Sequence, residues 1–195
     1  MRWALEEAGL PYEERLISVE ESKSESHRGM QPFGQVPVYE EDGLVLFESG
    51  AIVLHIAERS EVLMPSEPNA RARTKSWMFA ALNSVETQVQ NFAALDLFFA
   101  KEEWAKLRRP SALEAAQARL NALADWLKGK EYLEDRFTAG DLLMTTVLRI
   151  ARDTDLIAKM PVLEDYRLRC EARPAFQKAL AAQMAPFAKN APAGK

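Results

Sequence analysis

The stretch VPVYEEDGLVLFESGAIVLHIA, residues 36–57, decides the fold of the first part of the chain. Two apolar runs, residues 36–39 and 44–47, flank a turn that contains Asp42-Gly43, and this pattern is typical of a β-hairpin. Ser49 follows in the position of a helix N-cap, and the mostly apolar residues after it predict a helix buried against a sheet. We therefore expect two antiparallel strands and a helix that covers them.

Upstream of the hairpin the patterns are weaker. The chain begins within a predicted helix that ends at Gly9-Leu10-Pro11, a normal C-terminal stop. Residues 12–19 predict a modest strand, and the polar segment 22–30 predicts a loop or a short helix. The expected order is helix, strand, variable segment, strand, strand and helix.

Downstream, the Pro-containing segment 63–69 predicts a linker, and the sequence after it has a period near 3.6 without a strand pattern. The expected helices span residues 70–99, 111–128, 138–155, 161–173 and 174–184. Ser111-x-x-Glu114 predicts a capping box at the start of the second of these helices, and Thr138-x-x-Asp141 predicts one at the third. We expect Asp141 to accept hydrogen bonds at a helix start and not to act in catalysis.

Composition excludes several classes of protein. With 195 residues, 48% of them hydrophobic, the chain can bury a real core, and its formal charge of −4 leaves no basic face for nucleic acid. Cys170 is the single cysteine, which excludes an intramolecular disulfide and a C-x-x-C pair, and no metal site is expected. Without a leader pattern or an apolar run near the roughly 18 residues of a membrane helix, we expect a cytoplasmic protein with no membrane partner.

Three motifs occur in one order along the chain: QPFGQVP at residues 31–37, FESGAI at 47–52 and FTAGD at 137–141. Together they resemble the bacterial-type cytosolic glutathione S-transferase family, and the resemblance extends along nearly the whole chain. It implies a homodimer that uses glutathione as a co-substrate, needs no metal and serves in detoxification.

The resemblance also implies a domain organisation. Residues 1–62 would form a thioredoxin-like glutathione-binding domain, residues 63–69 a linker, and residues 70–195 an all-helical C-terminal domain. The family places a strand and a loop before the first helix, and the loop carries a Ser, Tyr or Cys that activates the glutathione sulfur. Here Met1 already falls within that helix.

The N-terminal domain is therefore expected to be incomplete, with its first strand missing and the catalytic residue unknown because its place lies before Met1. That strand would lie in the middle of the sheet, so its two neighbours would lack its ladder of backbone hydrogen bonds. Three explanations stay open: a start site assigned too late, a naturally shortened non-catalytic relative, or an N-terminus supplied by another chain.

Val36 and Pro37 form the first expected binding element. The resemblance implies a cis peptide bond between them, and the bend would leave the Val36 N–H and C=O free to pair with the cysteinyl part of glutathione. Gln35 is a candidate for the glycyl end of the ligand. The alternative is that Val-Pro simply begins a strand at a position where proline is permitted.

Glu48 and Ser49 form the second expected element. Ser49 would hold the γ-glutamyl carboxylate at a helix N-terminus, and Glu48 would accept from the ligand's ammonium group. The alternative is that Ser49 caps the helix and Glu48 is a solvated acid. His27 and Arg28 could meet the glycine carboxylate of the ligand, but we expect them to be surface residues.

Two functions follow from these features. The first is conjugation of the glutathione thiolate to a small hydrophobic electrophile held between the domains, or a related peroxidase or isomerase reaction. The second is a non-catalytic binding or partner protein on the same fold, because the strand and loop that carry the catalytic group are absent.

Overall fold

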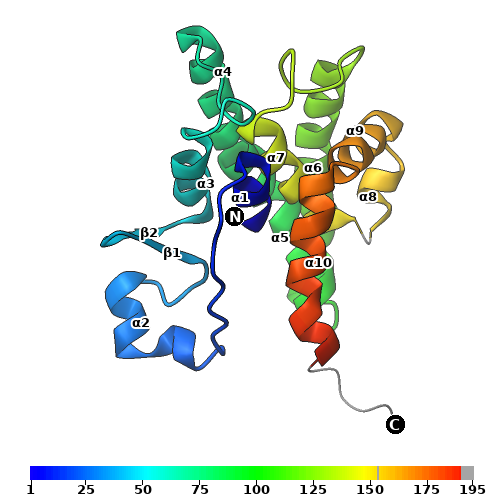
Figure 1. Cartoon of the computed structure of the whole chain (residues 1–195). Coiled ribbons are helices and arrows are strands. Elements are labelled where there is room, and N and C mark those ends of the chain that lie inside the picture. Colours follow the sequence, from blue (N-terminus) through cyan, green and yellow to red (C-terminus); the bar gives the residue numbers. More distant parts are fainter. Residues whose placement is uncertain (153, 190–195) are drawn as a thin grey trace.

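The computed structural model describes residues 1–152 and 154–189. The first part contains α1 (Arg2–Ala8), a 3-10 turn (Glu21–Lys23), α2 (Glu25–Met30), β1 (Val38–Glu41), β2 (Leu44–Phe47) and α3 (Ser49–Ala57). The second part contains α4 (Pro68–Phe79), a π-helical turn (Ala80–Glu86), α5 (Thr87–Phe98), α6 (Glu103–Leu127), α7 (Ala139–Leu148), a 3-10 turn (Arg149–Ala151), α8 (Asp155–Ala158), α9 (Pro161–Glu171) and α10 (Pro174–Lys189). This arrangement confirms the predicted fold class of a thioredoxin-like part followed by an all-helical part (Figure 1).

The predicted hairpin is present. Strands β1 and β2 pair antiparallel with Val38 opposite Phe47 and Glu41 opposite Leu44. Both residues of the connecting turn have positive φ, 48° at Asp42 and 84° at Gly43, which is the requirement of a type I′ hairpin turn. The first strand begins at Val38 and not at residue 36, because Pro37 has no N–H to contribute to a ladder.

The strand predicted for residues 12–19 is wrong. The segment takes a stretched-out, irregular path below α1 (Figure 1), and among the described residues the sheet has only the strands β1 and β2. No backbone of residues 12–17 takes part in a described backbone–backbone hydrogen bond. Alternating side chains favour a strand, but a strand forms only where a neighbour supplies its hydrogen bonds.

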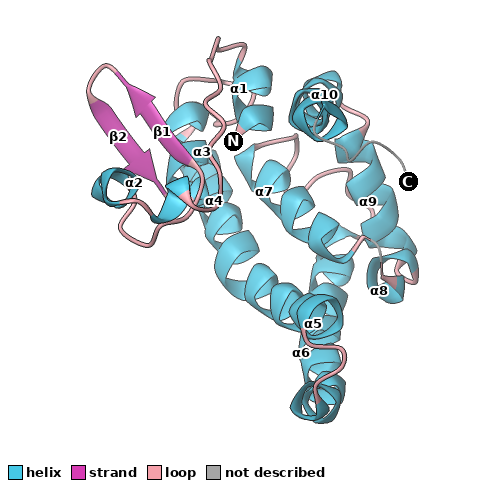
Figure 2. Ribbon diagram, turned by 90° about the horizontal axis from the view of Figure 1, so that it is seen from below, coloured by secondary structure: helices cyan, strands magenta, loops and turns pink. Residues whose placement is uncertain are grey.

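Helix α1 packs between α3 and α10 (Figure 2), although α10 is the last helix in the sequence. The buried Trp3 ring meets the Phe176 ring of α10 edge to face, with 4.9 Å between centroids. Arg173, just before α10, donates to both carboxylate oxygens of Glu7 at 2.6 and 2.8 Å. The N-terminal helix therefore belongs to the same core as the C-terminal helices.

Three predicted helix boundaries are wrong, and one of them is the end of the last helix, expected at residue 184 and observed at Lys189. The helix expected at residues 111–128 begins at Glu103, eight positions earlier, and Pro110 lies inside it. The Ser111 hydroxyl does not cap a helix start, because it donates backwards to the Arg108 carbonyl at 3.0 Å. The helix expected at 138–155 ends at Leu148, and its position 153 lies outside the described residues. Its predicted capping box between Thr138 and Asp141 is confirmed.

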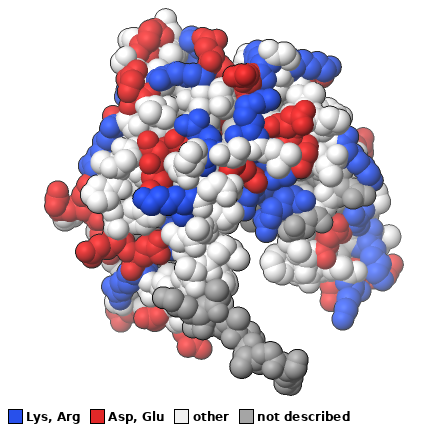
Figure 3. All heavy atoms as spheres, turned by 45° about the vertical axis from the view of Figure 1, so that its right-hand side comes forward, with Lys and Arg blue, Asp and Glu red and all other residues white. Residues whose placement is uncertain are grey.

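The surface carries charges of both signs. Lysines and arginines are interspersed with aspartates and glutamates on the face seen in Figure 3. None of the described helices combines the length and the apolar character that crossing a bilayer requires.

Candidate functional site

The loop that precedes β1 carries the first predicted element. The peptide bond between Val36 and Pro37 is cis, as the resemblance implied, and Val36 is exposed. Gln35 is also exposed, so both residues reach the surface next to the start of the hairpin.

Side chains of α2 and its flanking residues hold this loop in place. His27 is buried, and its Nε2–H donates to the Gln35 carbonyl at 2.7 Å, so the expectation that His27 is a surface residue is wrong. The Gln35 N–H donates to Oε1 of the buried Gln31 at 3.2 Å, and the Lys23 ammonium donates to the Gly34 carbonyl at 2.6 Å. Arg28 is exposed, as expected.

Sequence reasoning missed the roles of His27, Gln31 and Lys23 because each depends on how α2 folds back on the loop. The nearest sequence signal is Ser24, whose hydroxyl accepts from the His27 N–H at 3.2 Å and so begins α2. Gly34 adds a second constraint, since its φ is +62° and a Cβ there would lie 2.9 Å from the Ser22 carbonyl oxygen.

The register of the hairpin brings the two predicted elements together. Because Val38 pairs with Phe47, Pro37 and Glu48 are the next residues outward on the two strands, at the end of the hairpin opposite its turn. The exposed residue Val36 and the beginning of α3 therefore follow the end of the hairpin that lies opposite its turn.

Glu48 and Ser49 differ in detail from the prediction. Helix α3 begins at Ser49, so Glu48 and not Ser49 occupies the N-cap position, and no side chain caps the helix. Glu48 has φ 67° and ψ 117°, an unusual conformation for a residue with a side chain and one that tends to be kept at functional sites. Both residues are exposed, so the Ser49 hydroxyl and the first N–H groups of α3 can meet a ligand. The partial positive charge of such a helix start favours a carboxylate.

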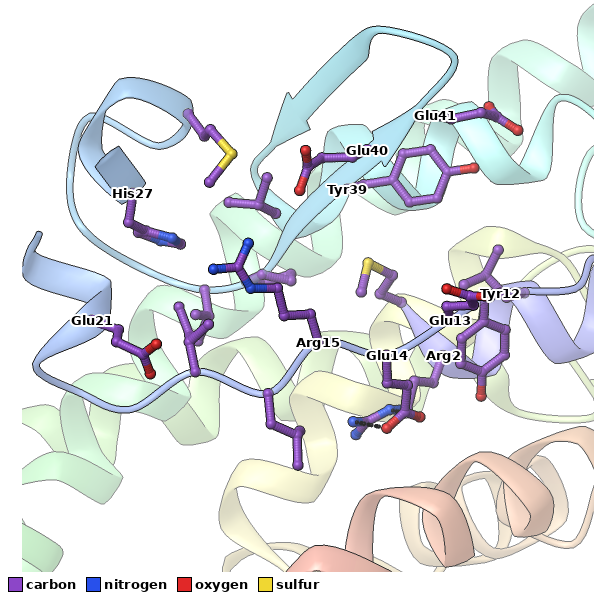
Figure 4. Close-up of a pocket in the computed structure, with 18 of the residues that line it drawn as sticks. Arg2, Tyr12, Glu13, Glu14, Arg15, Glu21, His27, Tyr39, Glu40 and Glu41 are labelled. Carbon is purple, nitrogen blue, oxygen red and sulfur yellow. Dashed lines mark hydrogen bonds and ion pairs between the residues drawn. The ribbon is translucent and has the colours of Figure 1, made fainter. Parts of the chain in front are cut away.

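A large cavity of about 1210 Å³ opens beside this end of the sheet (Figure 4). It is lined by residues 36–41 on one side and 11–17 on the other, with α1 and α2 between them. Glu48 and Ser49 do not line it. Val36 and Pro37 therefore line the cavity on one side and precede the strand that leads, through β2, to the exposed start of α3.

Two ionisable residues elsewhere have structural environments. The Asp141 carboxylate is fully buried and accepts from the N–H groups of Leu133 and Thr138 and from the Tyr166 hydroxyl, and burial raises its pKa. Burial likewise raises the pKa of the Cys170 thiol to about 12, so it carries no thiolate near neutral pH. Within the described residues no group of three or more His, Cys, Asp or Glu could hold a metal ion.

Comparison with known proteins matches both parts of the chain to one family, the glutathione S-transferases. The family model of the glutathione S-transferase N-terminal domain matches residues 1–58, and that of the C-terminal domain matches residues 90–174. A glutathione S-transferase of Hyoscyamus muticus is 30% identical over 173 residues, which cover 81% of this chain and 79% of the relative. Glutathione S-transferase 4 of Zea mays is 28% identical over 212 residues, covering 97% of this chain and 88% of the relative.

A solved structure extends the similarity to three dimensions. The crystal structure of a glutathione transferase family member from Pseudomonas fluorescens pf-5, with two glutathione bound, matches with a TM-score of 0.83 at 25% identity. The match covers 92% of this chain and 86% of that chain.

Proposed function

Because this chain belongs to the glutathione S-transferase family, we propose that it binds glutathione at the open end of the β1–β2 hairpin. The observation that supports the proposal is the pairing of Val38 with Phe47, since Pro37 and Glu48 are the next residues along the chain beyond this last pair. These four residues and Gln35 offer main-chain groups, a hydroxyl, a carboxylate and a helix start on one exposed edge.

Each group suits one part of the tripeptide. The exposed Val36 N–H and C=O pair with the cysteinyl backbone as one more short strand would. The Ser49 hydroxyl and the α3 N-terminus bind the γ-glutamyl carboxylate, while the Glu48 carboxylate accepts from the adjacent ammonium group. Gln35 faces the glycyl end of the ligand, and its backbone is held by hydrogen bonds to the side chains of His27 and Gln31.

The reaction that we propose for the bound ligand is attack of its thiolate on a small hydrophobic electrophile. A free thiol has a pKa of about 8.5, so the reaction needs a donor that favours the thiolate. The five proposed residues are anchors for the ligand backbone and its charged ends, and the Cys170 thiol is buried away from them. The second candidate is a glutathione-binding protein without transferase activity.

We expect Ser49→Ala to weaken glutathione binding about 5- to 150-fold, which corresponds to about 1 to 3 kcal/mol, because the ligand carboxylate loses a hydrogen bond. Isothermal titration calorimetry of the folded variants measures the change. Ser66→Ala, which removes a hydroxyl from an exposed residue of the segment before α4, is the matched control and should bind like the wild type.

Equal affinity in Ser49→Ala and wild type would contradict the proposed site. If the wild type binds glutathione, turnover with a panel of electrophiles then separates the two candidates. Conjugation supports the transferase, and binding without conjugation supports the binding protein.

We also propose that the chain forms a homodimer. Apolar side chains remain exposed on β2 and at the end of α4, namely those of Leu44, Val45 and Phe79. Static light scattering at micromolar concentration should give twice the 22.0 kDa mass of the chain. A monomer mass would contradict the dimer and would leave the glutathione site unaffected.

A further inference from the structure

A group of large apolar side chains is exposed where α5 ends and α6 begins. We call this group the aromatic tip, and it consists of Leu97, Phe98, Phe99, Trp104 and Leu107. Their exposed fractions run from 41% at Phe99 to 77% at Phe98. Figures 1 and 2 show the joined ends of the two helices at the periphery of the molecule, away from β1, β2 and the start of the chain. Apolar side chains concentrated in this way on a surface mark a site of contact with another body.

The aromatic tip is held in a fixed arrangement. The Phe99 ring contacts the rings of Phe98 and Trp104, with centroid distances of 6.4 and 5.1 Å. Next to these rings, Arg109 of α6 donates to both carboxylate oxygens of Asp96 on α5, at 2.7 and 2.8 Å. The two helices therefore present the three rings together as one connected surface.

Trp104 differs from the other tryptophans in its hydrogen bonding. The indole N–H groups of Trp3, Trp77 and Trp126 each donate to a protein acceptor, at 2.8 to 2.9 Å. The Trp104 N–H makes none of the described hydrogen bonds, and its ring is 52% exposed. An indole with an apolar body and a free donor suits a boundary between an apolar phase and water.

The charges beside the aromatic tip differ in sign from the charge of the whole chain. Residues 96–109 carry four cationic and three anionic side chains, a balance of +1, whereas the formal charge of the chain is −4. The cations are Lys101, Lys106, Arg108 and Arg109, and the anions are Asp96, Glu102 and Glu103. Asp96 is neutralised by Arg109, and Glu103 by Lys106 at 3.2 Å. The remaining charge is therefore positive and favours an anionic contact.

The size of the aromatic tip decides between two kinds of occupant. A stable protein–protein interface takes about 800 Å² and roughly 20 to 30 residues from each partner. The tip offers five large apolar side chains at the end of a helical hairpin. A lipid bilayer requires less, because apolar side chains enter its headgroup boundary to a depth of about 5 to 10 Å. Trp, Phe and Leu beside Lys and Arg are also the side chains typical of that boundary.

We propose that the aromatic tip docks the protein on the surface of an anionic lipid bilayer. The rings and the two leucines enter the headgroup boundary, while Lys101 and Arg108 remain at the level of the lipid phosphates. Such a contact needs no helix that crosses the bilayer. It uses none of the residues proposed to bind glutathione, so it is a function separate from that site.

The first test measures binding of the full chain to vesicles by co-sedimentation. One set of vesicles consists of phosphatidylcholine, and the other contains phosphatidylserine as well. We expect saturable binding to the anionic vesicles, at least fivefold weaker binding to the neutral ones, and a loss of affinity as the salt concentration rises. No binding to either set, or equal binding to both, would overturn the proposal.

The second test uses matched protein variants. Leu107→Ser removes an apolar side chain from the aromatic tip, and Leu168→Ser makes the same change at an exposed position of α9. Lys101→Gln removes a cation beside the tip, and Lys128→Gln removes one at the far end of α6. We expect at least a fivefold loss of vesicle affinity in Leu107→Ser, a smaller loss in Lys101→Gln, and none in the two controls. Equal losses in the two serine variants would overturn docking through the tip.

The third test locates the contact by fluorescence. Lipids brominated in their acyl chains quench tryptophans that enter the bilayer. We expect the quenching seen with the wild type to disappear in Trp104→Phe and to persist in Trp126→Phe, although Trp126 is also exposed. Quenching that persists in Trp104→Phe and disappears in Trp126→Phe would place the contact on another face and overturn the proposal.

Two further measurements separate the aromatic tip from the other proposals. Glutathione titration of Leu107→Ser should give the wild-type result, so a failure of glutathione binding leaves the vesicle result unchanged. Light scattering without lipid should give the same mass for Leu107→Ser and the wild type. A lower mass in Leu107→Ser would show that a second copy of the chain covers the tip, and the proposal would then be wrong. The comparison of the two vesicle sets decides the proposal even if a variant fails to fold.

Discussion

Replacing Asp141 with alanine is expected to lower the free energy of unfolding by roughly 3 to 8 kcal/mol. One carboxylate oxygen accepts from the Leu133 N–H at 2.8 Å and the Tyr166 hydroxyl at 2.9 Å, and the other accepts from the Thr138 N–H at 2.9 Å. Loss of the cap alone costs about 1 to 2 kcal/mol, and each further buried donor left without a partner adds about 1 to 3 kcal/mol.

Urea denaturation followed by circular dichroism measures this effect. Asp165→Ala is the matched control, because Asp165 is exposed on α9 and the same change there should shift stability by no more than about 0.5 kcal/mol. The stability loss of Asp141→Asn should lie between those of Asp141→Ala and Asp165→Ala, because the amide keeps one acceptor oxygen and lacks the other. A loss below about 1 kcal/mol in Asp141→Ala would mean that the buried donors find other partners.

Gly34→Ala is expected to cost roughly 2 to 5 kcal/mol of stability and to weaken glutathione binding as well. The left-handed backbone at φ +62° penalises any Cβ by about 1 to 2 kcal/mol. The added Cβ would also lie 2.9 Å from the Ser22 carbonyl oxygen, a backbone atom that cannot turn away, and overpacking of this kind costs about 1 to 3 kcal/mol. The displaced loop carries Gln35 and Val36, so the proposed glutathione contacts move with it.

Gly9→Ala separates the two causes. Gly9 has nearly the same φ, +67°, but nothing lies within 4 Å of the position that a Cβ would take there, so only the backbone penalty remains. Denaturation and glutathione titration of both variants should therefore give a smaller stability loss and unchanged affinity for Gly9→Ala. Equal stability losses in the two variants would show that the Ser22 contact relaxes without cost.

Local patterns in the sequence predicted those features that short stretches of chain determine. The Asp42-Gly43 turn specified the hairpin, and the spacing of Thr138 and Asp141 specified a helix start, because each depends on neighbours in the sequence. The cis bond at Val36-Pro37 came from the family resemblance and not from the local pattern. The residues proposed to bind glutathione were likewise named from motifs, and their juxtaposition depends on the register of β1 and β2.

Features that depend on distant contacts were not predictable in the same way. Residues 12–19 have the composition of a strand but no strand beside them, so they form an irregular segment. Ser111 matches a capping pattern, but no helix begins there. Helix α6 continues past Pro110 because Ala105 and Ala112, on either side of it, are both packed in the core. His27 was assigned to the surface because nothing in its neighbourhood indicates that α2 folds back on the loop of Gln35.

The packing of α1 against α10 affects how the protein unfolds. A cut within residues 63–69 would separate the chain at the boundary suggested by its sequence, but α10 would lose the cover of Trp3 and the Glu7 partner of Arg173. The two fragments would then each expose part of one shared core. Opening of the chain is therefore expected to be a single cooperative event that involves its first and last helices together.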